Sequence, residues 1–213
     1  MTATASGTRL WESLGKRRST AFLVGGLLLA VDAAWLAMNM STGAEGYLLP
    51  GQLFVGVGWT IALVGLLGLY PALSEQSRWL SRVGAVCAGI GVVTFAVMAV
   101  VVFVDITGLV AGVYEPMGAF FIPGVIVGSV LGFVAFSVAV FRTHADSVAF
   151  GLLLLAPPVL VLSNILRFVA GYTSEMVTLG IVIADALSLL VVGYYLRNQS
   201  PLGYPESAAQ SAA

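Results

Sequence analysis

Six long apolar segments constrain this chain more than any other feature of its sequence. They lie at about Thr20–Met40, Gln52–Ala72, Val83–Val104, Met117–Phe141, Ser147–Val169 and Met176–Leu196. Each is near the roughly 20 residues that an α-helix needs to cross about 30 Å of hydrocarbon. None alternates apolar and polar residues as a membrane β-strand does. The sequence therefore predicts an all-α, polytopic membrane bundle of six transmembrane helices.

The composition supports a membrane protein and argues against two other classes. Of the 213 residues, 59% are hydrophobic and only 9% are charged, whereas soluble domains carry about 25% charged residues. The lipid bilayer is therefore the first partner that we expect. A net charge of −1, without a concentrated basic face, predicts no nucleic-acid partner.

The basic residues predict the orientation of the helices. If the chain crosses the membrane six times, eight of its nine Lys and Arg residues fall on one side. They are Arg9, Lys16, Arg17, Arg18, Arg78, Arg82, Arg142 and Arg197. The connections Ser41–Gly51 and Asp105–Pro116, on the other side, contain none. Because Lys and Arg stay cytoplasmic, both termini are predicted to be cytoplasmic, in a multi-pass protein of the cell membrane.

Three parts of the chain are distinguished by composition. Residues 1–19 form a basic N-terminal tail on the cytoplasmic side, residues 20–196 the six-helix transmembrane domain, and residues 197–213 a cytoplasmic tail. The segments Met1–Gly15 and Asn198–Ala213 are small and polar, so we expect both to be disordered. The first apolar segment is longer than the core of a signal peptide, which predicts an uncleaved helix.

One short stretch carries a resemblance. It contains Gly-Leu-Tyr-Pro-Ala-Leu at Gly68–Leu73 and Ser-Arg-Val-Gly-Ala at Ser81–Ala85. Residues 65–85 resemble small, uncharacterised multispanning membrane proteins of halophilic archaea. A preference for Arg over Lys, with much Ala, Gly and Val, likewise suggests a prokaryotic genome rich in GC. The resemblance implies no activity, and the chain lacks the acid-rich composition of soluble halophile proteins.

The residues that carry redox, metal or nucleophilic chemistry are scarce. Cys87 is the only cysteine and His144 the only histidine, which excludes an intrachain disulfide and bis-histidine haem ligation. We therefore predict no catalytic residue, no metal and no cofactor. Two aspartates within spans, Asp32 and Asp185, leave an intramembrane aspartyl enzyme as a remote alternative. The G-x-G-D pattern of that class of proteases surrounds neither of them.

The fourth apolar segment carries a helix-packing motif. Gly124, Gly128 and Gly132 recur at four-residue spacing and line one face of a helix. Such a face lets a second helix approach closely. We expect that helix to belong to the same chain, with a second copy or another membrane protein as the alternative partner.

Polar residues within the spans form the candidate site. A charge near the bilayer centre costs about 2.5–3.5 kcal/mol, so such residues tend to be paired or functional. Asp32 in the first span and Asp185 in the sixth both lie roughly 12 Å below the outer surface, at about 1.5 Å per residue. The predicted cluster, a hypothetical ligand or ion pathway, is Asp32, Asn39, Asn164, Arg167, Asp185 and Ser188.

Arg167 breaks the distribution of the other basic residues, because it lies near the outer end of the fifth span. We expect it to pair with Asp32 or Asp185, the alternative being that it reaches the outer headgroups. The sequence thus favours a non-enzymatic bundle with a structural or accessory role. The alternative is a transporter of a small solute, an ion or protons that uses Asp32 and Asp185.

Overall fold

The computed structural model describes residues 3–42, 48–110, 112, 114–143, 148–172 and 174–198. Over these residues the chain is all-helical, and no strand occurs. Six stretches are long and apolar enough to cross a membrane: Ser13–Thr42, Leu49–Ser74, Arg78–Ile106, Phe120–Arg142, Val148–Val169 and Glu175–Asn198. The predicted six spans are confirmed, and each predicted segment overlaps one of these stretches.

The spans are built from eight α-helices and one π-helix in the described part of the chain. Their bounds are α1 Ala3–Thr42, α2 Leu48–Leu67, α3 Tyr70–Ser74, α4 Arg78–Ile106, α5 Tyr114–Val125, η1 Ile126–Leu131, α6 Gly132–Thr143, α7 Val148–Val169 and α8 Glu175–Asn198. The fourth span is therefore interrupted by the π-helix η1. Pro123 precedes that widened segment, and it has no N–H to donate within its helix.

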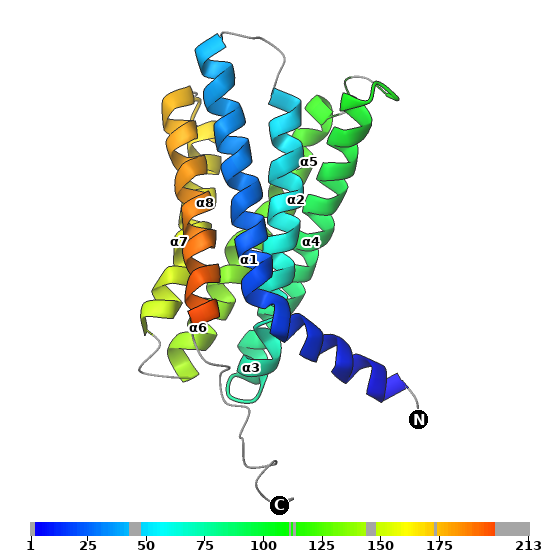
Figure 1. Ribbon diagram of the computed structural model, residues 1–213, viewed down its shortest axis with the longest axis vertical. Helices are drawn as coiled ribbons and strands as arrows, with labels where there is room; N and C mark the ends of the chain where they lie inside the picture. Colours follow the sequence, from blue (N-terminus) through cyan, green and yellow to red (C-terminus); the bar gives the residue numbers. More distant parts are fainter. Residues whose placement is uncertain are drawn as a thin grey trace, which may run out of the picture.

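The N-terminal segment is helical rather than disordered. Helix α1 starts at Ala3 and runs without a break into the first span, so the predicted disorder of Met1–Gly15 was wrong from residue 3 onward. Its first part turns away from the bundle (Figure 1). The Trp11 ring packs on Tyr70 with centroids 5.0 Å apart. This tertiary contact explains why composition alone misjudged the segment. The predicted disorder of residues 199–213 lies outside the described residues.

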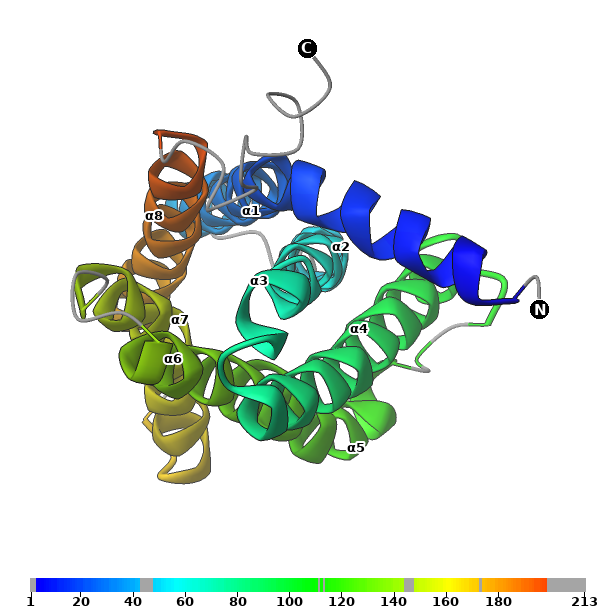
Figure 2. The ribbon, with the colours of Figure 1, turned by 90° about the horizontal axis from the view of Figure 1, so that it is seen from below.

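The six spans form a closed ring of neighbours. Helix α1 contacts α2 and α8, α2 contacts α4, α4 contacts the three pieces of the fourth span, and α7 joins α6 to α8. Viewed along the bundle, α2 lies toward the middle of this ring (Figure 2). Phe22, Trp59, Leu63 and Phe133 fill the centre and are almost completely buried. The ring therefore has a solid apolar core over much of its length.

The outer surface of the bundle is apolar, as a bilayer requires. Large side chains such as Val93, Val100, Leu152 and Phe168 are more than half exposed on α4 and α7. A water-soluble monomer rarely exposes such an extended apolar surface. The exposed side chains of these helices therefore face lipid in a membrane-embedded protein.

The three glycines of the predicted packing motif all face α4. A Cβ atom on Gly128 would overlap the backbone of Gly91, one on Gly124 would overlap Thr94, and one on Gly132 would lie 3.3 Å from Ala88 N. Gly128 and Gly91 thus bring the backbones of η1 and α4 into contact. In this structure the motif packs within the chain, and it leaves no groove on that face for a second copy.

Candidate functional site

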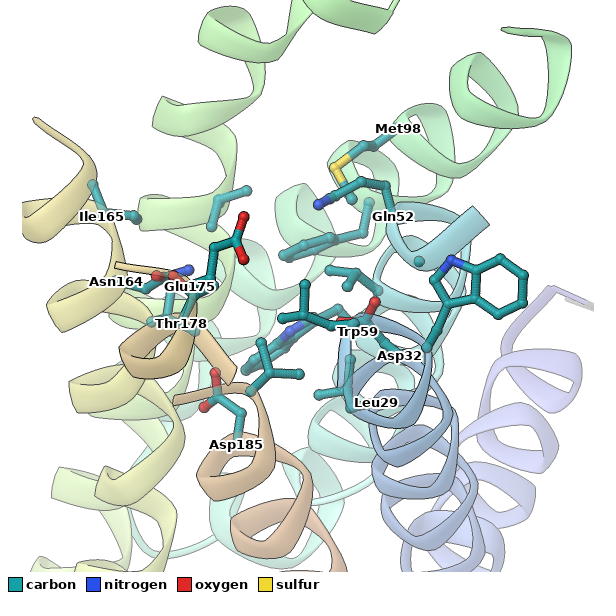
Figure 3. Close-up of a pocket in the computed structure, with 18 of the residues that line it drawn as sticks. Leu29, Asp32, Gln52, Trp59, Met98, Asn164, Ile165, Glu175, Thr178 and Asp185 are labelled. Carbon is teal, nitrogen blue, oxygen red and sulfur yellow. The ribbon is translucent and has the colours of Figure 1, made fainter. Parts of the chain in front are cut away.

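A cavity of about 430 Å³ opens among the helices at one end of the bundle (Figure 3). Its lining residues are Leu29, Asp32, Trp35, Leu36, Asn39, Gly51, Gln52, Val55, Trp59, Phe95, Met98, Val125, Val161, Asn164, Ile165, Glu175, Thr178, Val182 and Asp185. They come from the last half of α1, α4 and α7, from residues 51–59 of α2, from the first half of α8, and from Val125 at the end of α5. The cavity is therefore at the end of the bundle opposite the start of α1 and the end of α8 (Figure 1).

Two buried carboxylates lie on the walls of this cavity. Asp32 on α1 is 7% exposed and Asp185 on α8 is 8% exposed. The Oδ1 atom of Asp185 is fully buried and has no hydrogen-bond partner. A buried polar atom without a partner costs about 1–3 kcal/mol. The two aspartates that the sequence placed at equal depth therefore share one cavity, and at least one of them is left unsatisfied.

The close approach of α2 explains why the first of these acids is buried. A Cβ atom on Gly51 would lie 2.5 Å from the Asp32 Oδ1 atom. Only a residue without a side chain leaves room for the carboxylate at this point. Gly51 therefore positions the Asp32 side chain against the N-terminal part of α2.

Aromatic rings form the inner wall. Trp59 is 4% exposed, and its ring stacks on Phe95 at a centroid distance of 5.7 Å and an interplanar angle of 14°. It also meets Phe133 edge to face, with centroids 6.1 Å apart. A π-system held on two sides is a rigid surface. The wall of the cavity therefore includes a rigidly held tryptophan, which Figure 3 labels among the lining residues together with Asp32.

The rim is more exposed and mostly polar. Asn164 on α7 and Glu175 at the start of α8 are exposed, whereas Gln52 and Thr178 are half-buried. Glu175 adds a third carboxylate to the lining, and no Lys, Arg or His lines the cavity within the described residues. The charged side chains around this cavity are thus all acidic.

A chain of hydrogen bonds connects the rim to the connection between α4 and α5. The Tyr114 hydroxyl donates to Gln52 Oε1 at 3.2 Å, and burial raises the pKa of this phenol, so that it keeps its proton. Asp105 accepts hydrogen bonds from Gly112 N at 2.8 Å and Tyr114 N at 3.1 Å. Asp105 therefore holds the start of α5 in place and, through Tyr114, orients Gln52 at the cavity.

Arg167 does not pair with either aspartate. Its Nη2 atom donates to the carbonyl oxygens of Tyr172, at 3.3 Å, and Ser174, at 3.2 Å. Both acceptors belong to the connection between α7 and α8, and the Ser174 carbonyl also accepts the first helical bond of α8, from Thr178 N at 3.0 Å. The expected ion pair with Asp32 or Asp185 is therefore absent from the described residues. Arg167 instead ties the end of α7 to the start of α8, outside the cavity.

The other predicted site residues divide into two groups. Asp32, Asn39, Asn164 and Asp185 line the cavity. Ser188 does not line it. Its hydroxyl donates to the backbone carbonyl of Asp185 at 2.8 Å. This bond satisfies the serine locally and leaves the Asp185 side chain free to face the cavity.

Several lining residues were not among the predicted ones. Trp35 and Trp59 are apolar enough to pass for ordinary membrane residues, and Gln52 and Glu175 lie at helix ends, where polar residues are common. The shared helical face of Thr178 and Asp185 was the one signal that pointed to a further lining residue. Only the tertiary arrangement brings these side chains from α1, α2 and α8 together.

The lining of the cavity combines polar and apolar groups. In the described part of the chain, no three His, Cys, Asp or Glu side chains gather closely enough to hold a metal ion. What the walls offer are acceptor oxygens, a fixed aromatic face and an aliphatic surface. These groups can hold a small molecule by charge, hydrogen bonds and apolar contact.

Comparisons with protein-family models, curated proteins and solved structures found no match for this chain. The resemblance of residues 65–85 to membrane proteins of halophilic archaea therefore stays a prediction.

Proposed function

We propose that this protein is a non-enzymatic, multi-pass protein of the cell membrane that binds a small solute in the cavity between α1, α2 and α8. Both termini are proposed to be cytoplasmic, since the basic residues of the connections gather at one end. The cavity then lies in the outer half of the membrane. Solute would reach it from outside, past Asn164 and Glu175.

The unpartnered carboxylate of Asp185 carries this proposal. An acid in a membrane helix is costly and tends to mark a binding site or an ion pathway. A bundle that served only as scaffold would gain stability from an apolar residue at this place. Two buried acids on the wall of a cavity of about 430 Å³ instead support a site that gains its partner when solute enters.

A structural or accessory role is the second candidate. The backbone contact between Gly91 and Gly128 favours it, because such packing builds a rigid bundle. Under this alternative Asp32 and Asp185 would stabilise the fold, and their loss would lower the abundance of the protein. A coupled transporter is an extension of the first candidate, in which the bound solute or ion is also released inside.

Thermal melting of the purified protein with small cationic, neutral and anionic solutes separates the two candidates. We expect at least one solute to raise the melting temperature, because a ligand stabilises the folded state by mass action. The shift should disappear in Asp32→Asn and Asp185→Asn, while both variants accumulate normally. If no solute shifts the melt and both variants are lost from the membrane, the structural role is correct and the binding proposal is wrong.

A further inference from the structure

We infer that the solute is a small organic cation with an apolar body, held by its positive group between Asp32, Asp185 and Trp59. This inference rests on the proposed function and names the class of solute for that same cavity. Under this inference the cavity does not bind anionic solutes, and it does not bind neutral solutes that have the same shape as the cation.

The charge of the lining carries the first step. Three acidic side chains line the cavity, and no basic side chain among the described residues lines it. Arg167, the basic residue whose position suggested that it would do so, is held by the carbonyls of Tyr172 and Ser174. A cleft lined by one sign of charge between low-dielectric walls concentrates ions of the opposite sign. The cavity is thus selective for cations.

The unpartnered oxygen of Asp185 carries the second step. Its Oδ1 atom is fully buried, lacks a hydrogen-bond partner, and belongs to a side chain that is 92% buried on the cavity wall. In Figure 3 the Asp185 and Asp32 side chains reach the cavity from α8 and α1. A cation between them would compensate the Asp185 side chain by charge and, where it carries an N–H group, by a hydrogen bond to that side chain.

The size and the aromatic wall distinguish an organic cation from a metal ion. A volume of about 430 Å³ is within the range of small-molecule pockets, roughly 300–1,000 Å³. No three His, Cys, Asp or Glu side chains lie close enough together to hold a metal ion in the described part of the chain. Trp59, held by Phe95 and Phe133, lines the cavity with the small part of its ring that is exposed, and tryptophan gives the strongest cation–π contact. Leu29, Val161 and Val182 supply apolar surface for the rest of the molecule.

The arrangement of the acids also suggests a route of entry. Glu175 is exposed at the rim. Asp32 on α1 and Asp185 on α8 are buried deeper in the bundle. A cation would meet the rim carboxylate while still hydrated and would reach the buried pair after losing water. Gln52 and Asn164 lie on this path and can replace part of that hydration.

Binding to the purified full-length protein tests the inference with two cations, choline and tetraethylammonium. Each is compared with a neutral molecule of the same shape in which carbon replaces the charged nitrogen. We expect at least one cation to raise the melting temperature in a saturable manner and its neutral counterpart to have no effect. Asp185→Asn should weaken the apparent affinity about 10- to 100-fold, as the loss of a charged contact does.

Glu75→Gln is the matched control, because Glu75 is an exposed acid in the connection between α3 and α4, away from the cavity. It should leave the affinity unchanged. Equal affinity for a cation and its neutral counterpart, or binding of anionic or neutral solutes only, would overturn the inference and leave the proposed function intact. The absence of any binding, with all three charge classes tested, would overturn both.

A second measurement avoids the chance that Asp185→Asn fails to fold. A hydrophobic carbodiimide modifies buried carboxyl groups, and mass spectrometry locates the modification in the unaltered protein. We expect modification of the peptide that contains Asp185, and protection of this peptide by the cation that binds. Modification at the same rate with the cation at saturating concentration would show that it binds elsewhere, which contradicts the inference.

Discussion

Replacing Gly128 by leucine is expected to destabilise the bundle by more than about 3 kcal/mol, at or beyond the upper end of ordinary overpacking costs. Even a Cβ atom at this position would overlap the Gly91 backbone, and backbone cannot move aside as a flexible side chain can. The two helices would have to separate along their whole contact. Thermal melts in detergent and the amount of protein in the membrane measure the effect.

Gly89→Leu is the matched control, because Gly89 lies on α4, the helix that Gly128 contacts, and a Cβ atom there would meet nothing within 4 Å. It should melt like the parent or slightly higher, since leucine favours the helix more than glycine does. If Gly128→Leu also accumulated and melted like the parent, the backbone contact between η1 and α4 would be refuted.

The second large effect is a gain of stability, caused by a substitution at Asp185. Asp185→Leu is expected to stabilise the solute-free protein by about 3 kcal/mol, near the upper end of the cost of an unsatisfied buried group. The same variant should no longer bind the solute, because it lacks the carboxylate. Such a gain of stability with a loss of function is common where a binding site is strained.

Thr178→Leu is the control for this prediction. Thr178 lines the same cavity from α8, but its hydroxyl is satisfied by the Ser174 carbonyl at 3.1 Å. Its replacement relieves no unpartnered group, so the melting temperature should change little. A lower melting temperature for Asp185→Leu than for the parent would mean that the carboxylate already contributes to the fold.

Much of the fold was predictable because the bilayer limits what a chain can do. The length and apolarity of the segments were enough to predict six spans. In lipid every backbone N–H and C=O group must be paired within the protein, and few structures achieve this. The break at η1 was not predictable in the same way. Pro123 and Gly128 were visible in the sequence, but the widened helix depends on how closely α4 approaches.

The site was predictable in part for a similar reason. Depth along a helix follows from residue count, so Asp32 and Asp185 were expected at the same level. Direction around the helix and the identity of the neighbours depend on packing. Arg167 shows this limit, because its partners are the backbone carbonyls of Tyr172 and Ser174, and a sequence displays charged side chains but not the position of backbone carbonyls.

If the cavity is a solute site that opens to the outer face of the membrane, a reagent added outside intact cells should reach its lining. Cysteine labelling measures this access, with Thr178→Cys and Gln76→Cys each made in a Cys87→Ser background. Thr178 lines the cavity, whereas Gln76 is exposed at the opposite end of the bundle. A cationic, membrane-impermeant thiol reagent added outside should label Thr178→Cys and leave Gln76→Cys unlabelled. Labelling of Gln76→Cys, with Thr178→Cys protected, would contradict the account.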